Sequence, residues 1–310
     1  MPGAYAHLTM VNVAKESAHL EKLTFSNPAA SALLKYFKYC ELGAVSPDYP
    51  YLAIGDSAAE KWADLMHYDR TGEVLRAGIS GAKALQGDQR ERAFAWLLGY
   101  SAHVATDVTI HPIVELKVGP YAQNKKAHRV CEMHQDAYIW GTRMNLGGVG
   151  VSKHLTSGIL RCTEINQPGI VDNTVKGLWE QMLRSAHPVE ASANPPRVDK
   201  WHEGFDLVVN KIAGEGHRLF PFARHVAANQ GLTYPTFDEV DHKEYIDELK
   251  APTGTLHYDA IFDRAKDSVG KAWSSIEKAV YGDDANAVSS FGDWNLDTGR
   301  NSRNELVFWA

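Results

Sequence analysis

The sequence has little cysteine, no long apolar run and no cluster of basic residues. Three cysteines in 310 residues are too few and too scattered for a disulfide framework or a cysteine-rich metal site. No stretch approaches the roughly 20 uncharged apolar residues of a transmembrane helix. The formal net charge is −6 and Lys and Arg form no run, whereas stable binding to nucleic acid needs a basic surface. These absences exclude a disulfide-rich scaffold and a transmembrane anchor, and they argue against stable nucleic-acid binding.

The first residues also lack the pattern of a secretory signal. The segment 1–7 has neither a basic n-region nor an apolar h-region. We therefore expect a cytoplasmic protein. Export by a route that needs no signal peptide stays open as an alternative.

Aromatic residues and histidine are abundant. Eight Trp, thirteen Tyr and ten Phe are spread along a chain with 44% hydrophobic residues, which is enough for a packed core and excludes a disordered chain. Fourteen His stand against three Cys. If this protein binds a metal, the ligands are therefore expected to be imidazole and carboxylate groups.

Helical periodicity dominates the chain. Apolar residues recur three and four positions apart over 91–111, and we expect Pro112 to end this helix and Asp88 to cap its start. A second clear helix is expected over 124–144, and the alternation typical of strands is scarce. The predicted fold class is all-α, with one bundle-like domain over residues 1–310.

Weaker patterns complete this expected domain. Further helices are predicted over 9–23, 29–41, 57–68, 72–86, 170–186, 199–228, 238–249 and 257–281. The tail 290–310 has turn residues and aromatic residues but no helical period. We expect the tail to pack aromatic side chains against the bundle, and a lid or substrate-facing loop is the alternative.

Histidine and carboxylate residues recur at helical spacing on the first clear helix. His103, Asp107 and His111 are four residues apart, so their side chains follow one face. A single His/Asp pair at this spacing is often only an ion pair on a helix surface. His103 lies within a strongly apolar stretch, however, where an unpaired polar group is costly to bury. This face therefore needs polar partners.

The next expected helix offers partners of the right chemical type. His128, Glu132 and Asp136 repeat the four-residue spacing. Imidazoles and carboxylates that project inward from facing helices commonly build metal sites in bundles. The spacing of the two helices thus favours metal binding within residues 1–140 over two unrelated ion pairs.

A third set of polar residues is dispersed along the chain. His7 lies near the start, Asp48 follows Pro47 in a turn, and His67 ends an expected helix. Taken alone, Asp48 is typical of an Asx-type turn and His67 of a histidine stabilised by a helix dipole. Only the wider constellation gives these residues a functional interpretation.

Together these segments resemble a known family. The segment 102–112 looks like the HxxxDxxxHP segment of zinc-dependent phospholipase C proteins, and 128–136 is similar to their following HxxxExxxD helix. The turn 46–48 resembles the family's Pro-Asp turn, and 2–7 resembles its opening Met-Pro-x-x-x-x-His. S1/P1-type nucleases share the same all-α scaffold and ligand set. The resemblance therefore points to a superfamily more firmly than to a substrate.

The resemblance implies a cluster of two or three zinc ions. The implied ligands are Asp48, His67, His103 and Asp107 for one ion; His111, His128 and Glu132 for a second; and His7, with Asp107 as a bridge, for a third. In secreted members a processed N-terminal Trp chelates the third ion, and no Trp is near the start of this sequence. The third ion therefore has one implied ligand fewer in this chain than in the secreted members.

Three further roles follow from the resemblance. Asp48 would act as general base or orient the attacking water, or it would be a plain ligand. Asp136 would be an acceptor that fixes a ligand imidazole. Tyr49 would bind substrate, as part of a cage that holds a choline ammonium by cation–π contact, although Asp64 stands where such a cage would need another aromatic ring.

The implied activity is zinc-dependent hydrolysis of a phospholipid or related small phosphodiester. One alternative is an S1/P1-like nuclease or nucleotidase, which would need an aromatic clamp for a base. Another is a non-catalytic all-α protein that keeps the metal site for structure or ligand capture.

Overall fold

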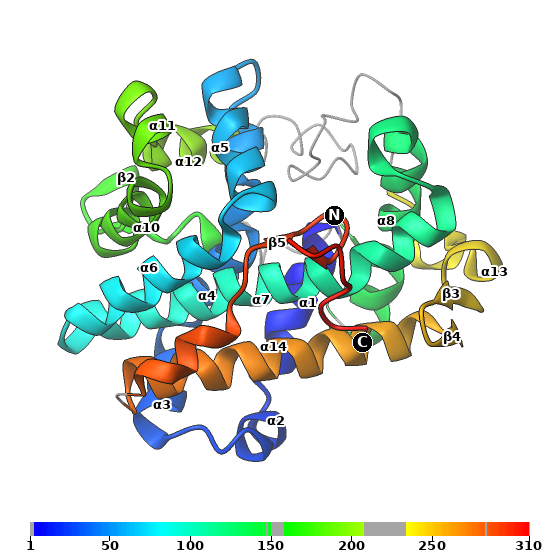
Figure 1. The fold of residues 1–310 in the computed structure, drawn as a ribbon, viewed down its shortest axis with the longest axis horizontal. Helices are drawn as coiled ribbons and strands as arrows, with labels where there is room; N and C mark the ends of the chain where they lie inside the picture. Colours follow the sequence, from blue (N-terminus) through cyan, green and yellow to red (C-terminus); the bar gives the residue numbers. More distant parts are fainter. Residues whose placement is uncertain are drawn as a thin grey trace.

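The computed structural model describes residues 3–144, 146, 148–149, 158–207, 234–282 and 284–309, and the fold is all-α, as predicted (Figure 1). The α-helices are α1 (Ala4–Ala14), α2 (Ser17–Lys22), α3 (Asn27–Lys35), α4 (Phe37–Val45), α5 (Ser57–Tyr68), α6 (Thr71–Ala84), α7 (Gly87–Val118), α8 (Tyr121–Arg143), α10 (Asn173–Ala186), α11 (Pro188–Ala193), α12 (Val198–Leu207), α13 (His242–Tyr245) and α14 (Tyr258–Val280). Short 3₁₀ helices are η1 (Ser46–Leu52), η5 (Phe237–Glu239) and η6 (Ala285–Ser290).

The strands of the described residues form three antiparallel pairs. These are β1 (Thr163–Glu164) with β2 (Gln167–Val171), β3 (Leu249–Ala251) with β4 (Gly254–Leu256), and β5 (Trp294–Asn295) with β6 (Arg300–Asn301). Each pair is too small to organise a core. Helix packing therefore determines the architecture.

Helix α7 is the centre of the molecule. It crosses the middle of Figure 1, with α14 alongside it, and it packs against α4, α6, α8 and α1. Every residue from Ala93 to Val114 is buried. On a helix that is buried on all sides, a polar side chain contacts other protein groups and not water. Polar side chains within this stretch therefore require partners.

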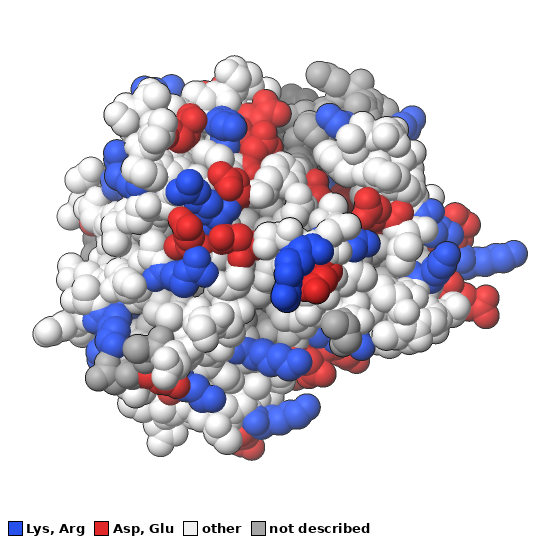
Figure 2. Space-filling view, viewed as in Figure 1, with Lys and Arg blue, Asp and Glu red and all other residues white. Residues whose placement is uncertain are grey.

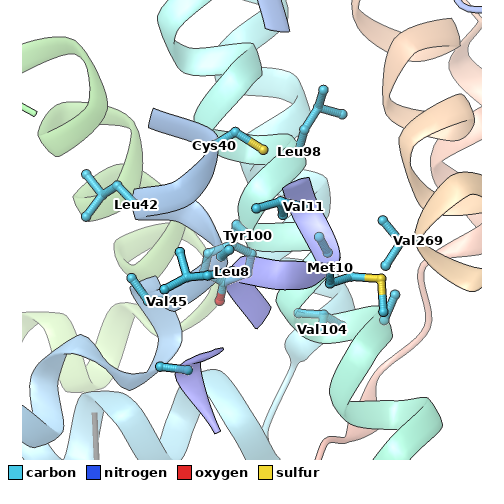
Figure 3. Close-up of a cluster of buried hydrophobic side chains, with 14 of the residues drawn as sticks. Leu8, Met10, Val11, Cys40, Leu42, Val45, Leu98, Tyr100, Val104 and Val269 are labelled. Carbon is cyan, nitrogen blue, oxygen red and sulfur yellow. The ribbon is translucent and has the colours of Figure 1, made fainter. Parts of the chain in front are cut away.

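Two glycines allow α4 and α7 to approach closely. A Cβ at Gly99 of α7 would overlap the carbonyl oxygen of Cys40, and one at Gly43 of α4 would overlap the carbonyl oxygen of Trp96. Around this crossing, apolar side chains of α1, α4 and α7 form part of one hydrophobic cluster (Figure 3). The crossing brings the end of α4, and η1 after it, against the middle of α7.

Helix α7 continues past Pro112, so the predicted end at this proline is wrong. The C-terminal tail covers the helix where proline interrupts its hydrogen bonds. Gly299 packs directly on Pro112 and on the carbonyl of Val108. This carbonyl receives no helical hydrogen bond from position 112, because proline has no backbone N–H. The indole Nε1 of Trp309 donates to the neighbouring carbonyl of Thr109 at 2.7 Å. This coverage compensates for the interruption, and the helix runs on to Val118.

Other predicted boundaries were also inaccurate. Asp88 lies in the first turn of α7 rather than at its cap, which is Gln86. The range 9–23 contains the end of α1, a break and α2. The start of α1 was missed because this helix is buried almost all round, so its sequence lacks the alternation of apolar and polar faces that indicates a helix. Likewise, 29–41 contains parts of α3 and α4.

The later half of the chain shows two more differences. Residues 167–171 form β2, so α10 begins three residues later than expected. The range 238–249 contains the end of η5 and the short α13, whose N-cap is Asp241, and then enters the β3–β4 hairpin. The helix predicted over 199–228 is described only as far as Leu207, and its remainder lies outside the described residues.

The tail after η6 contains no helix over residues 291–309, as predicted. Trp294 and Trp309 are buried in it, which confirms that the tail packs aromatic side chains against the bundle. On the face shown in Figure 2, Lys and Arg are interspersed with Asp and Glu. Among the described residues, the helices are too short or too polar for any of them to cross a membrane.

Candidate metal centre

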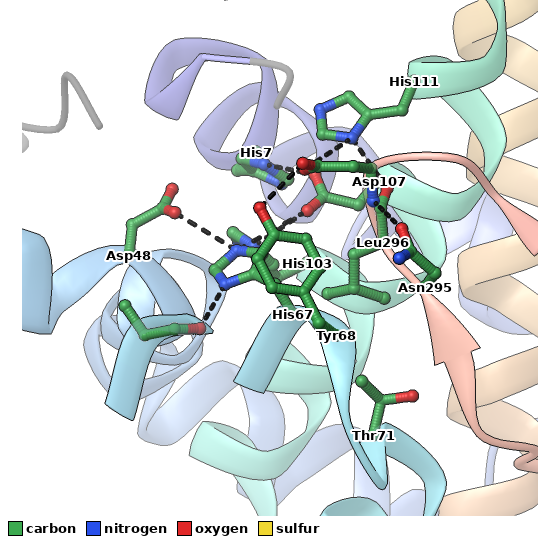
Figure 4. Close-up of polar contacts among 12 residues, drawn as sticks. His7, Asp48, His67, Tyr68, Thr71, His103, Asp107, His111, Asn295 and Leu296 are labelled. Carbon is green, nitrogen blue, oxygen red and sulfur yellow. Dashed lines mark hydrogen bonds and ion pairs between the residues drawn. The ribbon is translucent and has the colours of Figure 1, made fainter. Parts of the chain in front are cut away.

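The buried stretch of α7 carries three of the predicted ligands. His103, Asp107 and His111 lie on successive turns, and all three side chains are buried. The four-residue spacing places them along one face, as the sequence indicated. This face is directed towards α1, η1 and α5, which supply the dispersed residues (Figure 4).

His7 of α1, Asp48 of η1 and His67 of α5 converge on this face. His7 Nε2 lies 3.1 Å from Asp107 Oδ1, and His103 Nε2 lies 3.2 Å from Asp107 Oδ2. His67 Nε2 lies 3.4 Å from Asp48 Oδ1 and 3.9 Å from Asp107 Oδ2. The rings of His7 and His103 are stacked, with centroids 4.0 Å apart.

These residues form two groups in which one donor atom from each residue lies within 4.8 Å of the others. The first group is His7, His103 and Asp107, and the second is Asp48, His67 and His103. His103 belongs to both groups. The structure therefore brings together five of the eight predicted ligands, drawn from α1, η1, α5 and α7.

Backbone carbonyls fix the orientation of three imidazoles. Nδ1 of His67 contacts the carbonyl of Ala63 at 2.7 Å, and Nδ1 of His103 contacts that of Ala44 at 2.9 Å. Nδ1 of His111 contacts the carbonyl of Leu296 at 2.7 Å. A carbonyl oxygen can only accept, so Nδ1 carries the proton in each ring. In the neutral imidazole, Nε2 then presents a lone pair.

The donor atoms of the cluster fit a metal ion. Within the described residues, Nε2 of His7, His67, His103 and His111, Oδ1 of Asp48 and both carboxylate oxygens of Asp107 are buried and make no hydrogen bond. At the cluster, nitrogen and carboxylate oxygen atoms of this set face one another at 3.1–3.9 Å. Buried polar atoms without partners are costly unless another group satisfies them. Imidazole nitrogen and carboxylate oxygen are ligands that Zn²⁺ accepts.

The electrostatics keep the carboxylates ionised despite their burial. Burial alone would raise the pKa of Asp107, but the facing imidazoles of His103 and His111 hold that pKa well below its usual value. Burial would likewise raise the pKa of Asp48, yet the His67 imidazole holds it below the usual value. Burial lowers the pKa of His7, and the neighbouring His103 lowers it further. Burial alone would lower the pKa of His103, but the Asp107 carboxylate raises it above its usual value, so the carboxylates of the metal-free cluster attract a proton to that ring. Metal ligation requires a neutral ring, so a bound cation would take the place of this proton.

The second predicted zinc site is not assembled. Among the described residues, His111, His128 and Glu132 do not form a ligand group like the two above. His128 Nε2 donates to the carbonyl of Gly119 at 2.6 Å, and Glu132 Oε2 lies 3.6 Å from Arg129. Helix α8 thus directs these two side chains to protein partners in this structure.

Asp136 contacts backbone and a tyrosine, not an imidazole. Its Oδ1 accepts from the backbone N–H of Ala6 at 2.9 Å, and its Oδ2 accepts from the Tyr234 hydroxyl at 2.8 Å. Burial raises the pKa of Asp136 to about 7. The prediction that it fixes a ligand imidazole is therefore corrected: it ties α8 to the first turn of α1, next to His7.

Tyr49 does not face the cluster, so its predicted contact with substrate is also corrected. Its side chain is fully buried, its hydroxyl lies 3.0 Å from His202 Nδ1, and its ring packs on Trp179 and Phe205. Other rings lie closer to the candidate ligands. The ring centroids of Tyr51 and Tyr68 lie 6.0 and 6.1 Å from that of His67.

The C-terminal tail contributes contacts that the sequence did not indicate. The Leu296 carbonyl accepts from His111, and Asp297 Oδ1 lies 3.6 Å from the same Nδ1. These residues lie about 185 positions from His111, and no spacing or motif links them. In the sequence, this part of the tail was marked only by its turn-forming residues around Asn295.

Comparison with known proteins agrees with this geometry. Residues 6–189, more than half of the chain, match the family model described as zinc dependent phospholipase C. That range includes the ligands of both groups. Neither the search of curated proteins nor the search of solved structures finds a match.

Proposed function

The chain belongs to the zinc-dependent phospholipase C family, and on this premise we propose that it hydrolyses a phospholipid or a related phosphodiester. The observation that carries the proposal is the orientation of the imidazoles. In His67, His103 and His111 a backbone carbonyl holds Nδ1, and the buried Nε2 on the other side of the ring makes no hydrogen bond among the described residues. Such pre-orientation by a second partner is characteristic of metal-binding histidines.

The proposed zinc ligands come from the two groups and are divided between the ions as the family resemblance implies. Asp48, His67, His103 and Asp107 would hold one ion, and His7 would hold a second through the shared Asp107. When bound, zinc polarises phosphoryl oxygens and lowers the pKa of a coordinated water to about 7. The ion assigned to His111, His128 and Glu132 would require these side chains to converge, and it stays a prediction.

The chain's own residues would orient and deprotonate the attacking water. Asp48 lies on η1, its Oδ1 is 3.4 Å from His67 Nε2, and this oxygen makes no hydrogen bond among the described residues. Since its pKa is held low by His67, it is an acceptor at neutral pH. We assign it the role of general base.

Asp48→Asn tests this assignment. The amide keeps the shape of the side chain but cannot accept a proton, so kcat is expected to fall by about 10²–10⁴-fold. Zinc should be retained when the metal is supplied in excess, because His67, His103 and Asp107 would still hold it. Metal analysis and steady-state kinetics of the same preparation provide the measurement. Loss of zinc together with activity would make Asp48 a plain ligand instead.

The function itself is tested by substrate turnover with and without metal. We expect the purified protein to hydrolyse a chromogenic choline phosphodiester, to lose this activity on chelation, and to regain it when zinc is added. Single-stranded nucleic acid is the comparison substrate. Turnover of nucleic acid alone would favour a nuclease, and full zinc loading without turnover of either substrate would favour a non-catalytic metal protein.

A further inference from the structure

One residue of the C-terminal tail contacts two of the candidate ligands. The N–H of Leu296 donates to the backbone carbonyl of His67 at 2.9 Å, and its own carbonyl accepts from His111 Nδ1 at 2.7 Å (Figure 4). Leu296 is fully buried. The peptide groups on either side of this residue therefore link α5 to α7 at the metal centre.

The tail is held in this position by α6. The hydroxyl of Thr71 donates to the Trp294 carbonyl at 2.9 Å and accepts from the Trp294 N–H at 2.7 Å. Asp293 accepts from the N–H groups of Gly72 and Glu73 at the first turn of α6. These contacts fix the chain immediately before Leu296, so its carbonyl is a pre-positioned acceptor.

Asp297 adds a negative charge at the same place. Its Oδ2 accepts from the Tyr68 hydroxyl at 2.7 Å, while its Oδ1 lies 3.6 Å from His111 Nδ1. Its side chain is only 13% exposed, which strengthens its interaction with the ring. A carboxylate on the Nδ1 side of an imidazole favours the Nδ1–H form and makes Nε2 a stronger metal ligand.

We propose that the C-terminal tail completes the metal centre, with the Leu296 carbonyl and the Asp297 carboxylate as the groups that position His111 for a zinc ion. This inference rests on the proposed function, because it requires a zinc ion at the Nε2 of His111, an atom that is buried and makes no hydrogen bond among the described residues. It assigns a role to a segment that lies outside residues 6–189, the range that matches the family model. Asp297 is in this view a positioning residue, since it acts through His111 rather than on substrate.

The test compares neutralising variants of two carboxylates in the same tail. Asp297→Asn removes the charge beside His111, and zinc affinity, measured by competition with a chromogenic chelator, is expected to fall by about 10–100-fold. Asp297→Glu, which keeps the charge, should recover most of that affinity. The matched control is Glu305→Gln, which neutralises an exposed carboxylate of the same tail that contacts Asn301 and Arg303, and it should leave zinc affinity within about twofold.

Tyr68→Phe is the second variant. It removes the hydroxyl that holds the Asp297 carboxylate and should weaken zinc binding by a few-fold without unfolding the protein, because the ring is retained. The thermal midpoints of the metal-free proteins are measured in parallel. A loss of affinity in Asp297→Asn without a matching loss of stability supports the positioning role.

Two results would overturn the inference. Unchanged zinc affinity in both Asp297→Asn and Tyr68→Phe would leave the tail with a purely structural role, while the proposed function would stand. Failure of the wild-type protein to bind zinc would remove the proposed function and this inference together.

Discussion

Asp107→Asn is expected to remove tightly bound zinc and to lower phosphodiesterase activity by more than about 100-fold. Each oxygen of Asp107 faces a different imidazole, with Oδ1 near His7 and Oδ2 near His103. Loss of partners outside the ligand shell already costs 10–100-fold in metal affinity or activity, so loss of a shared ligand should cost more. Metal analysis and kinetics of the purified variant measure both effects.

The matched control is Asp88→Asn. Asp88 lies on the same helix, but it is exposed and pairs with Lys35 at the surface. Zinc content and activity should therefore equal those of the wild type. If Asp107→Asn retained its zinc, or if the two variants behaved alike, Asp107 would not be the shared ligand.

Gly99→Ala is expected to destabilise the fold by at least about 3 kcal/mol. A methyl group here would overlap the backbone carbonyl of Cys40, and neither helix can yield as a flexible side chain would. The gain from replacing a helical glycine by alanine is only about 0.5–1 kcal/mol, so the overlap dominates. The thermal midpoint should fall by more than about 5 °C.

Gly177→Ala provides the comparison. Gly177 lies inside α10, and a Cβ there would meet no atom within 4 Å. The same substitution should leave the thermal midpoint unchanged or raise it slightly. A Gly99→Ala variant as stable as Gly177→Ala would contradict the close approach of α4 and α7.

Features that depend on local spacing could be predicted from the sequence. The four-residue intervals of His103, Asp107 and His111 follow directly from helix geometry, and the structure places these side chains on one face. The all-α class followed from the same periodicity. The end of α7 was misjudged because its continuation past Pro112 depends on the tail, including Gly299, which no local pattern shows.

Features that depend on long-range contacts could not be predicted. Leu296 and Asp297 reach His111 only through the path of the tail over α6 and α7. Tyr49 follows Asp48 directly, but consecutive residues of a 3₁₀ helix point in different directions, and Tyr49 enters the aromatic core instead. His128 likewise has the expected spacing, yet its ring binds the Gly119 carbonyl.

The central claim is that the buried His/Asp cluster holds zinc. Anomalous scattering at the zinc absorption edge, measured on crystals of the zinc-loaded protein, tests it most directly. If this cluster holds zinc, a peak is expected about 2.0–2.2 Å from His103 Nε2 and from a carboxylate oxygen of Asp107. Zinc bound only at other sites, or no peak at this cluster in fully loaded protein, would contradict it.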